Sequence, residues 1–370
     1  MKVKVGDITK IKTGKLDANA SSTDGKYPFF TCSKEPLKID TYSYDCECVL
    51  VAGNGDLNVK YYNGKFDAYQ RTYIIEDDSN GLLYMPYLYY FLERYIEVLR
   101  KQSIGGVIKY IKLGNLTEAL IELPSIEEQK HVVSLMNISS ELISLRKNII
   151  DKLETLIKAR FVEMFGDPQI NEKGFIKAPM GEYLSVLTDF SSNGSYKTLD
   201  SGVIMYDEPS YAWMVRTTDL ESGDMSSIKY IDKKAYELLS KSKIFGGEII
   251  MNKIGSAGKI YLMPKPTMSA SLGRNAFMFR FDERINNVFI YYLLTSDYGQ
   301  REIQQYVRGA VTKTITKDDA RAVLIIEPPI KLQKQFVDFV QQVDKSKLAV
   351  QQSLEKTQQL FDSLMQEYFG

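Results

Sequence analysis

The amino-acid sequence repeats itself at an offset of 204 positions. At this offset residues of the same type coincide without a gap, in the pairs Gly105 and Gly309, Val107 and Val311, Lys109 and Lys313, Ile111 and Ile315, Pro124 and Pro328, Ile126 and Ile330, Gln129 and Gln333, and Gly166 and Gly370. Matches of this length that include glycine and proline indicate a duplicated architecture, and so long a period is typical of two domains rather than a solenoid. The sequence therefore predicts two half-molecules in tandem.

A long helix is predicted after each repeated proline. Ser125 and Glu128 have the spacing of a capping box, which satisfies the free amides at the start of a helix. Apolar residues then recur at three- and four-residue intervals, as in a seam against another helix: Val133, Met136, Leu142, Leu145, Ile149, Leu153 and Leu156, with Val337, Val340, Leu348, Leu354, Leu360 and Leu364 in the second copy. Gly166 and Pro168 end the first helix. We expect the two helices, over 123–166 and 327–370, to pack on each other.

The segments before the two helices are rich in predicted strands and turns. In the first half, residues 48–52 predict a buried strand and residues 53–56 a turn; residues 59–62 followed by Asn63-Gly64 predict a hairpin. Residues 71–75 predict a returning strand, and Pro86 opens an aromatic helix. Residues 246–255 and 289–294 repeat the strand and the aromatic helix.

We therefore predict an α+β fold. It contains two β-rich α/β domains, residues 1–122 and 167–326, in a pseudo-twofold tandem repeat, separated by two long helices packed as an antiparallel coiled coil. Because the second copy stops where the first would enter a new domain, we expect the C-terminus to lie near Val5.

The charge balance argues against a broadly cationic surface. Lys plus Arg and Asp plus Glu both total 47, so the net charge is zero. Any binding to nucleic acid must then rely on basic residues that cluster locally or on a partner that supplies more positive charge. No apolar run is long enough to span a bilayer, and the first residues lack the apolar core of a signal peptide, which predicts a cytoplasmic protein.

The residues that carry catalysis or bind metals are scarce. Cys32, Cys46 and Cys48 are spaced unlike a zinc site, and we interpret them as buried or idle thiols. His131 is the only histidine, which excludes most His-based triads, and we expect it at a solvated helix position. Gly53-Asn54-Gly55 lacks the continuation of a phosphate-binding loop, and no Asn-Pro-Pro-aromatic run of an amino methyltransferase occurs. We predict no catalytic residue, no cofactor site and no metal site in this chain.

Basic and amide side chains alternate with aromatics in two comparable regions. Arg and Lys bond guanine edges, Asn and Gln bond adenine edges, and Ser, Lys and Tyr position phosphates. Solvated loops with ordinary surface charges would have the same residue types. The predicted DNA-binding residues are Lys60, Tyr62, Lys65, Gln70 and Arg71 in the first half and Arg216, Asn252, Lys253, Ser256, Lys259, Arg274 and Asn275 in the second.

Over its whole length the chain resembles the specificity subunit of type I restriction-modification enzymes. Residues 123–129, Leu-Pro-Ser-Ile-Glu-Glu-Gln, are similar to that family's Pro-Pro-Leu-Glu-Glu-Gln signature, and residues 328–333 are a weaker echo with Lys331-Leu332 in place of two glutamates. Gly105-Gly106-Val107, Gly309-Ala310-Val311 and Gly247-Glu248-Ile249-Ile250 are also similar, whereas Asn54-Gly55-Asp56 departs from the family's Ser-Gly-type loop.

The resemblance implies two target recognition domains, each reading one half of a bipartite double-stranded DNA site. It implies that the long helices set the spacer and dock two modification subunits, which methylate adenine at N6 with S-adenosylmethionine. Restriction subunits that use ATP and Mg²⁺ would complete the complex.

Two other functions are compatible with parts of the sequence. A non-catalytic, helix-paired scaffold whose β-rich heads bind protein would agree with the neutral charge. A degenerate nuclease would cut DNA in the presence of magnesium. Neither explains why the Pro-x-Ile-x-x-Gln helix start occurs twice.

Overall fold

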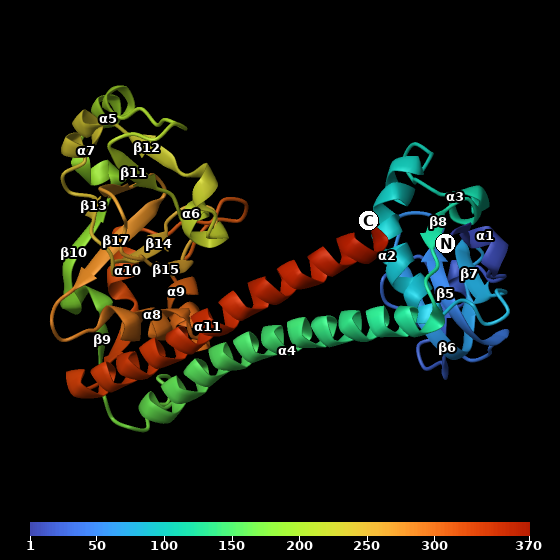
Figure 1. Ribbon diagram of the computed structural model, residues 1–370. Coiled ribbons are helices and arrows are strands. Elements are labelled where there is room, and N and C mark those ends of the chain that lie inside the picture. Colours follow the sequence, from blue (N-terminus) through green and yellow to red (C-terminus); the bar gives the residue numbers. More distant parts are fainter. The chain divides into compact units, whose positions relative to one another are not determined.

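The computed structural model describes residues 1–370, except for the side chain of Met225, and divides into two compact units. Unit 1 comprises Met1–Ile149 and Ala349–Gly370, and unit 2 comprises Ile150–Leu348 (Figure 1). Each unit therefore contains a β-rich domain, the N-terminal half of the long helix that follows it and the C-terminal half of the other long helix.

Unit 1 is built on a six-stranded sheet with the order β2-β7-β5-β6-β3-β4 and a small antiparallel pair, β1-β8. Its elements are β1 (Lys2–Lys4), α1 (Val5–Ile8), β2 (Thr9–Thr13), β3 (Tyr27–Phe30), β4 (Leu37–Ile39), β5 (Tyr44–Ala52), β6 (Val59–Ala68), β7 (Thr72–Asp77), α2 (Met85–Gln102), α3 (Leu113–Thr117) and β8 (Leu120–Glu122). Pro86 lies in the first turn of α2, as predicted, where its missing N–H costs no hydrogen bond.

Unit 2 contains two four-stranded sheets, β10-β17-β14-β15 and β12-β11-β16-β13, and the pair β18-β9. Its strands are β9 (Ile176–Pro179), β10 (Leu184–Asp189), β11 (Ala212–Val215), β12 (Lys229–Ile231), β13 (Lys243–Ile244), β14 (Ile249–Asn252), β15 (Ile260–Leu262), β16 (Ala270–Leu272), β17 (Ala276–Phe281) and β18 (Leu324–Glu327). Its shorter helices are η2 (Met180–Tyr183), α5 (Tyr196–Gly202), α6 (Thr217–Ser222), α7 (Lys233–Leu238), α8 (Asn287–Thr295), α9 (Asp297–Gln304) and α10 (Lys317–Ala322).

The two units share a common frame. The strand order β2-β7-β5-β6 in unit 1 matches β10-β17-β14-β15 in unit 2, and all of these pairs are antiparallel. In the same way β1-β8 corresponds to β9-β18, α1 to η2, α2 to α8 and α3 to α10. The registers place Ala52 opposite Thr72 and Asn252 opposite Ala276, so these ends of the sheets are equivalent. The repeat seen in the sequence is thus a repeat of the fold.

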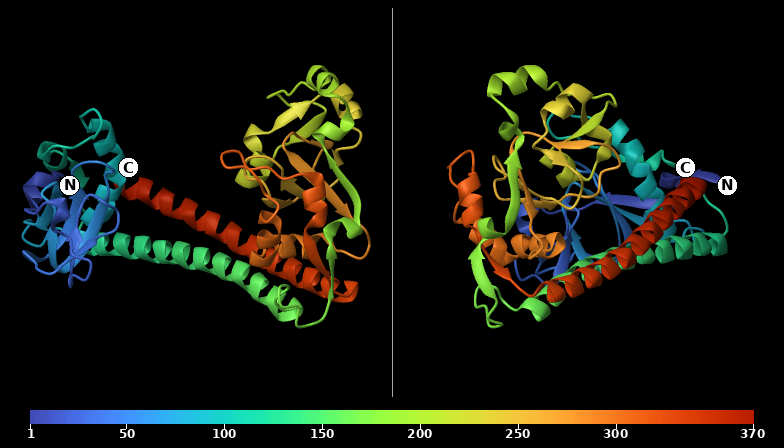
Figure 2. Two further views of the ribbon diagram at one scale, coloured as in Figure 1. Left: turned by 180° about the vertical axis from the view of Figure 1, so that it is seen from behind. Right: turned by 90° about the vertical axis from the view of Figure 1, so that its left-hand side faces the viewer.

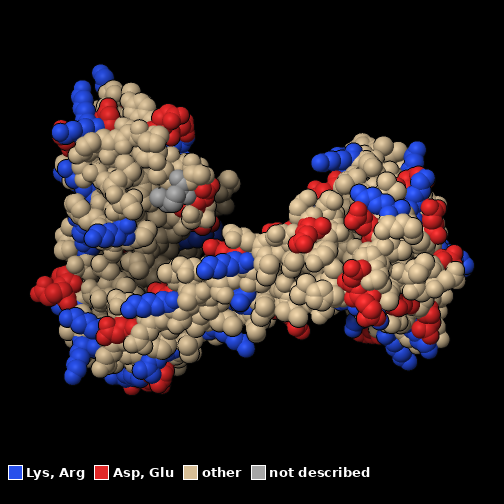
Figure 3. All heavy atoms as spheres, viewed as in Figure 1, with Lys and Arg blue, Asp and Glu red and all other residues tan. Residues whose placement is uncertain are grey.

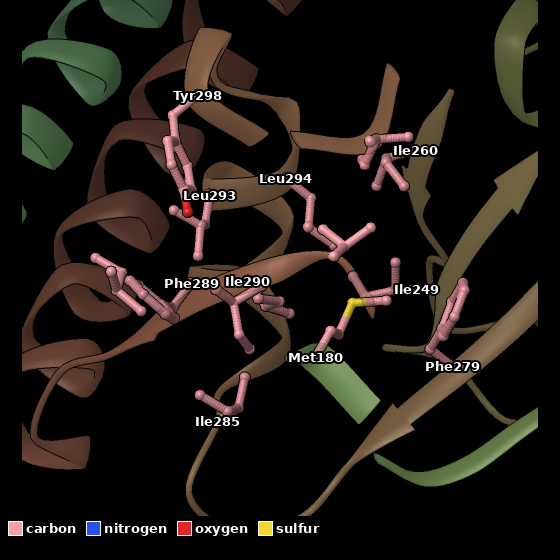
Figure 4. Close-up of a cluster of buried hydrophobic side chains, with 14 of the residues drawn as sticks. Met180, Ile249, Ile260, Phe279, Ile285, Phe289, Ile290, Leu293, Leu294 and Tyr298 are labelled. Carbon is pink, nitrogen blue, oxygen red and sulfur yellow. The ribbon is translucent and has the colours of Figure 1, made fainter. Parts of the chain in front are cut away.

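The core of unit 2 lies between its shared sheet and α8. Figure 4 shows Ile249, Ile260 and Phe279 from the sheet region facing Phe289, Ile290, Leu293 and Leu294 from α8. Of these side chains only Ile260 is as much as 5% exposed. In unit 1, α2 buries Leu88, Phe91 and Leu92 in a cluster that includes Val49 and Val51 of β5. The prediction of two core-facing aromatic helices is confirmed.

Each unit pairs two long helices in antiparallel fashion. The helices are α4 (Ile126–Phe165) and α11 (Ile330–Phe369). In unit 1, Val133 and Met136 of α4 belong to one cluster with Phe361 and Met365 of α11, and Arg146 bonds to Thr357. In unit 2, Phe161 and Phe165 pack edge-to-face against Phe336, and Glu154 pairs with Lys347.

The predicted start and end motifs of α4 are present in the structure. The Ser125 hydroxyl accepts from the Glu128 amide at 3.3 Å, and the Glu128 carboxylate accepts from the Ser125 amide at 2.9 Å, which is the capping box. Gly166 follows α4 with a φ of 71°, a conformation that glycine adopts without strain. His131 is exposed, as expected.

The predicted helix seam is wrong for part of its residues. Leu142, Leu145 and Leu156 of α4 are 38%, 55% and 47% exposed, and Leu348 and Leu360 of α11 are 60% and 54% exposed. A helix in a two-helix pair is covered along one stripe, and these leucines lie outside that stripe. They form apolar positions that the described residues of this chain leave open to solvent.

The predicted hairpin at Asn63-Gly64 is also wrong. β6 continues through both residues, which pair with Glu47 and Cys46 of β5, and Phe66 beyond them is fully buried. Burial of Phe66 holds the strand in register past the glycine, whose φ of 139° is tolerated inside the strand. The chain turns before β6, at the turn predicted for residues 53–56, and again after Ala68.

The glutamine that follows each repeated proline explains why the motif is duplicated. Gln129 is fully buried: its oxygen accepts from the Tyr84 amide at 2.8 Å, and its amide nitrogen donates to the carbonyls of Leu82 and Pro124. Gln333 makes the same three bonds to the Asn286 amide and to the carbonyls of Arg284 and Pro328. In each unit the amide group fastens the start of a long helix to the segment that leads into α2 or α8.

The C-terminal residues pack within unit 1. The Phe369 ring lies 4.9 Å from the Tyr87 ring between centroids, and Tyr368 and Phe369 join the cluster that contains Val5. The predicted proximity of the C-terminus to Val5 is confirmed within this unit.

Candidate nucleic-acid interface

The predicted DNA-binding residues of unit 1 lie along β6 and the turn that follows it. Lys60 is half-buried, and its ammonium group bonds to the Asn58 side chain. Burial lowers the pKa of Lys60 from its ordinary value. Tyr62 packs on Phe30 and Phe66 at ring-centroid distances of 5.1 and 5.7 Å. Lys60 and Tyr62 are therefore partly engaged in holding the sheet edge.

The other three residues of unit 1 are exposed. The Lys65 ammonium group lies 4.7 Å from the centre of the Tyr42 ring, a cation–π contact. Gln70 donates to the Asp17 carboxylate at 2.8 Å. Arg71 bonds through its backbone carbonyl, which accepts from the Gly53 amide at 2.8 Å and leaves the guanidinium group at the surface. The structure brings Gln70 and Arg71 together at the β6–β7 turn, away from Lys65.

In unit 2, three of the predicted residues line one pocket. Arg216, Arg274 and Asn275 surround it together with Phe190, Met205 and Met214. Arg216 donates to both oxygens of the buried Asp219 and to the carbonyl of Ser227, which fixes its guanidinium plane. Arg274 lies 5.1 Å from the centre of the Phe190 ring and pairs with Asp200 at 3.2 Å. The pocket thus has a cationic rim and an apolar wall.

Asn252, Ser256 and Lys259 belong to the turn that follows β14. Asn252 is 4% exposed and donates to the Ser256 hydroxyl at 2.9 Å. Lys259 pairs with Glu221, which also accepts from the Tyr261 hydroxyl at 3.2 Å. Because the Asn252 side chain is buried and bonded, it shapes this turn, whereas Ser256 and Lys259 are exposed.

Lys253 is part of a charge cluster that was not predicted. The Asp189 carboxylate accepts from Lys253 at 2.9 Å, from Lys317 at 2.8 Å and from the Ser192 hydroxyl at 2.7 Å. Burial opposes ionisation of Asp189, but the bonds from Lys317, Lys253 and Ser192 outweigh it and lower its pKa to about 2. One carboxylate thus holds two lysines at an open pocket that Ser191 and Phe277 also line.

No sequence signal pointed to Asp189 or Lys317. They lie 128 positions apart, and at the repeat offset Lys317 aligns with Leu113. Only the pairing of β10 with β17 and the position of α10 bring them together.

The two signs of charge are interspersed over the visible surface (Figure 3). Among the residues whose side chains are described, no group of three His, Cys, Asp or Glu could hold a metal ion. Cys48 is buried and Cys32 and Cys46 are half-buried, all as free thiols. Burial raises the pKa of Cys46 to about 11 and also raises that of Cys48. Cys46 and Cys48 are therefore poor nucleophiles near neutral pH.

The fold is thus a tandem α+β repeat, in which two units with the same strand order carry different loops. The model of the type I restriction modification DNA specificity domain matches this chain over residues 1–155 and 176–359. The chain therefore belongs to this family.

Two curated specificity subunits are similar to this chain to different extents. The type I restriction enzyme EcoDI specificity subunit of Escherichia coli is 37% identical over 156 residues, which is 42% of this chain and 34% of the relative. The MjaVIII specificity subunit of Methanocaldococcus jannaschii is 22% identical over 92% of this chain and 85% of the relative. The chain thus spans about a third of the first relative and most of the second.

A solved structure has the same fold. The crystal structure of the type I restriction-modification S subunit from M. genitalium matches 100% of this chain and 96% of that chain, with a TM-score of 0.64 and 15% sequence identity. The α+β tandem architecture is therefore that of specificity subunits. Among the described residues, none of the helices is long and apolar enough to cross a membrane.

Proposed function

We propose that this chain selects the DNA sequence on which a type I restriction-modification complex acts and catalyses no reaction itself. Residues 1–122 and 167–326 are the two target recognition domains, and each reads one half of a bipartite double-stranded DNA site. The helices over 123–166 and 327–370 set the spacer between the half-sites.

The observation that carries this proposal is the shared frame with different loops attached to it. The same four strands, the same helix start and the same buried glutamine occur in both units. The segments between the equivalent strands differ: residues 14–43 in unit 1 form β3 and β4, whereas residues 190–248 in unit 2 form α5 to α7 and three strands of the second sheet, β11, β12 and β13. Two different loop sets on one frame fit the reading of two different half-sites.

The long helices offer docking positions for partner subunits. Ile138, Leu142 and Leu145 of α4 are 52%, 38% and 55% exposed in unit 1, and Leu156, Val162 and Leu348 are 47%, 60% and 60% exposed in unit 2. Apolar side chains at helical spacing that remain open in water support burial by another helix. We propose that two modification subunits, which methylate adenine N6 with S-adenosylmethionine, bind here.

The full complex would add restriction subunits that use ATP and Mg²⁺. It acts on DNA in the cytoplasm, and the partner subunits supply much of the phosphate contact that this neutral chain lacks.

Within this proposal, the exposed cations are the base-reading candidates. Arg71 and Arg274 have exposed side chains in different units, and Arg274 rises beside a pocket with an apolar wall. Ion pairs with carboxylates fix the side chains of Arg216, Lys253 and Lys259 in place, and these cations contact DNA from fixed positions. Phosphates are positioned by Lys65, Gln70 and Ser256. Lys60, Tyr62, Asn252 and Asn275 shape the loops that make these contacts.

The test is to co-express the chain with the modification subunit encoded beside it and to map methylated adenine across the host DNA by single-molecule sequencing. We expect a split motif with two short defined blocks around a fixed spacer. Arg71→Ala should relax one block, and Arg274→Ala should relax the other.

A matched control is Lys10→Ala, because Lys10 is an exposed cation that lies opposite Glu76, away from the loops of interest. It should leave both blocks unchanged. If the two proteins copurify and no motif appears, DNA reading by these domains is refuted.

A further inference from the structure

Each unit projects one short hairpin with an apolar apex. We name residues 104–110 and 308–314 the tip hairpins. In unit 1, Ile104 and Tyr110 exchange backbone hydrogen bonds of 3.0 and 2.9 Å; in unit 2, Arg308 and Thr314 exchange bonds of 2.9 and 2.7 Å. Both hairpins therefore have the same closed geometry. Figure 2 shows the orange-red segment before α10 projecting from the rest of unit 2.

Both hairpins require glycine at their first corner. Gly105 has a φ of 119° and Gly309 a φ of 105°. An added Cβ would approach the Ile108 carbonyl oxygen to 2.5 Å and the Thr312 carbonyl oxygen to 2.1 Å. Any other residue would open the loop, so the fold of the apex is specified twice at aligned positions.

The side chains at the two apices do not pack against the rest of the protein. Val107 is 104% exposed and Val311 98%, and Ile108 beside Val107 is 62% exposed. A β-branched side chain that is this fully hydrated costs free energy relative to a polar one. Two such valines at equivalent apices indicate burial against another molecule.

The charge around the tips identifies that molecule. Residues 101–113 contain Lys101, Lys109 and Lys112, and residues 305–317 contain Arg308, Lys313 and Lys317; neither segment contains Asp or Glu. In a chain with a net charge of zero, the segments that contain the tip hairpins thus carry basic residues only, of which Arg308 pairs with Asp319 and Lys317 with Asp189. Lys109 and Lys313 are exposed and align with each other, and neither has an ion-pair partner among the described side chains. Such a surface complements a polyanion.

The tips adjoin the candidate DNA interface. The Gly55 amide donates to the Lys109 carbonyl at 2.9 Å, and the Gly255 amide donates to the Lys313 carbonyl at 2.9 Å. The Ile315 amide donates to the carbonyl of Lys253, one of the predicted DNA-binding residues. Both tips are therefore fastened to the turn after the equivalent strand, β5 or β14.

We propose that the two tip hairpins contact DNA independently of its sequence, beside each half-site. Lys109 and Lys313 bind phosphates, and Val107 and Val311 enter the groove as apolar wedges. This inference rests on the proposed function. It follows from the repetition. The recognition loops differ between the units, whereas both tips keep the corner glycine, the apical valine and the following lysine at aligned positions, so we infer that they contact something common to both half-sites. The sugar-phosphate backbone and the groove walls are common to both half-sites.

The experiment uses the complex of this chain with its modification subunit and measures binding to a cognate and an unrelated duplex by fluorescence anisotropy at several salt concentrations. The variant Lys109→Ala with Lys313→Ala should weaken binding to both duplexes by the same factor, about tenfold or more. It should reduce the slope of log K against log salt by about 2, close to 0.9 for each phosphate contact.

A second variant, Val107→Ser with Val311→Ser, keeps the glycines and lysines. It should weaken binding to both duplexes with an unchanged salt slope, because it removes apolar contact but no charge. The methylated motif should stay the same in both variants.

The control is Lys10→Ala with Lys265→Ala, because both lysines are exposed and lie toward the other end of the shared sheets. Binding with wild-type affinity and slope by the tip variants would overturn the inference, as would loss of the modification subunit on purification, which would make the tips protein-docking sites. If the wild-type complex itself yields no split motif, the proposed function fails; if it yields one and the tip variants bind normally, only this inference fails.

Discussion

Unit 1 and unit 2 have the same strand order, but different side chains hold the strands and helices of each unit together. Where β10 of unit 2 ends in Asp189, which holds two lysines, the register places Thr13 at the corresponding end of β2 in unit 1. In unit 2 the rings of Phe161, Phe165, Phe289 and Phe336 pack together, whereas the residue of unit 1 that aligns with Phe336 is Val132. The buried glutamine is the contact that has stayed the same. The comparison teaches that the duplicated fold depends on topology and on one amide group more than on repeated core side chains.

The two units can be followed separately. Trp213, the only tryptophan, is buried in unit 2, whereas all three cysteines lie in unit 1 and Cys48 is fully buried. Tryptophan emission therefore reports unfolding of unit 2, and thiol labelling of Cys48 reports opening of unit 1.

The largest effect is expected for Phe336→Ala. The ring is fully buried and contacts Phe161, Phe165 and Tyr292, so its loss leaves a cavity and should lower the free energy of unfolding of unit 2 by about 3–5 kcal/mol. Val132→Ala at the aligned position should cost unit 1 about 2 kcal/mol, because fewer buried carbon atoms are removed. Urea titration with the two probes measures both. Equal losses in the two units would contradict the unequal role of this position.

Gln129→Ala and Gln333→Ala should have the next largest effect, and an equal one. Each removes three hydrogen bonds and leaves a buried backbone amide and two carbonyls without their partner, at a cost of about 2–3 kcal/mol to its own unit. Gln335→Ala is the control, since Gln335 is exposed on the same helix. A marked difference between the two variants would break the equivalence of the units.

The sequence predicted those features that the duplication marks. Four residues that recur at one offset are Gly105, Pro124, Gln129 and Gly166. From their recurrence the sequence predicted two domains, two helix starts and the helix ends. Gly64 was misleading because burial of Phe66, two residues further along β6, decides that the chain does not turn there. The exposed leucines were assigned to a seam because spacing alone does not tell which apolar stripe a partner helix covers.

The candidate site was predictable only in its residue types. Arg216, Lys253 and Arg274 were selected as basic residues near turns, but their carboxylate partners Asp219, Asp189 and Asp200 were not. For Asp189 and Asp200 the partner is distant in sequence, so the ion pair depends on the fold.

The Asp189 cluster predicts a pH dependence in unit 2 that unit 1 lacks. Its pKa is lowered to about 2 in the folded protein, so its contribution is fully present above the unfolded value of about 3.9 and is lost as the pH falls toward 2. The loss amounts to about 2 kcal/mol. Asp189→Asn should remove this part of the pH dependence from tryptophan-monitored urea midpoints measured between pH 5 and pH 2.5, while Cys48 labelling of unit 1 stays as in the wild type. The same acid-induced loss in the variant would show that other carboxylates carry it.

The smallest effect is expected where the long helices make polar contacts. Lys347 pairs with Glu154 in unit 2, and both side chains are more than a third exposed, 37% and 53%. Water and salt screen such a pair, so Lys347→Ala should change the free energy of unfolding by less than about 1 kcal/mol. Leu348→Ala beside it should be equally mild for the isolated chain, because Leu348 is 60% exposed. If the modification subunit covers this stripe, the two variants will separate in the complex: Leu348→Ala will weaken copurification and Lys347→Ala will not. A loss of binding with the lysine variant alone would assign the docking to charge instead of apolar burial.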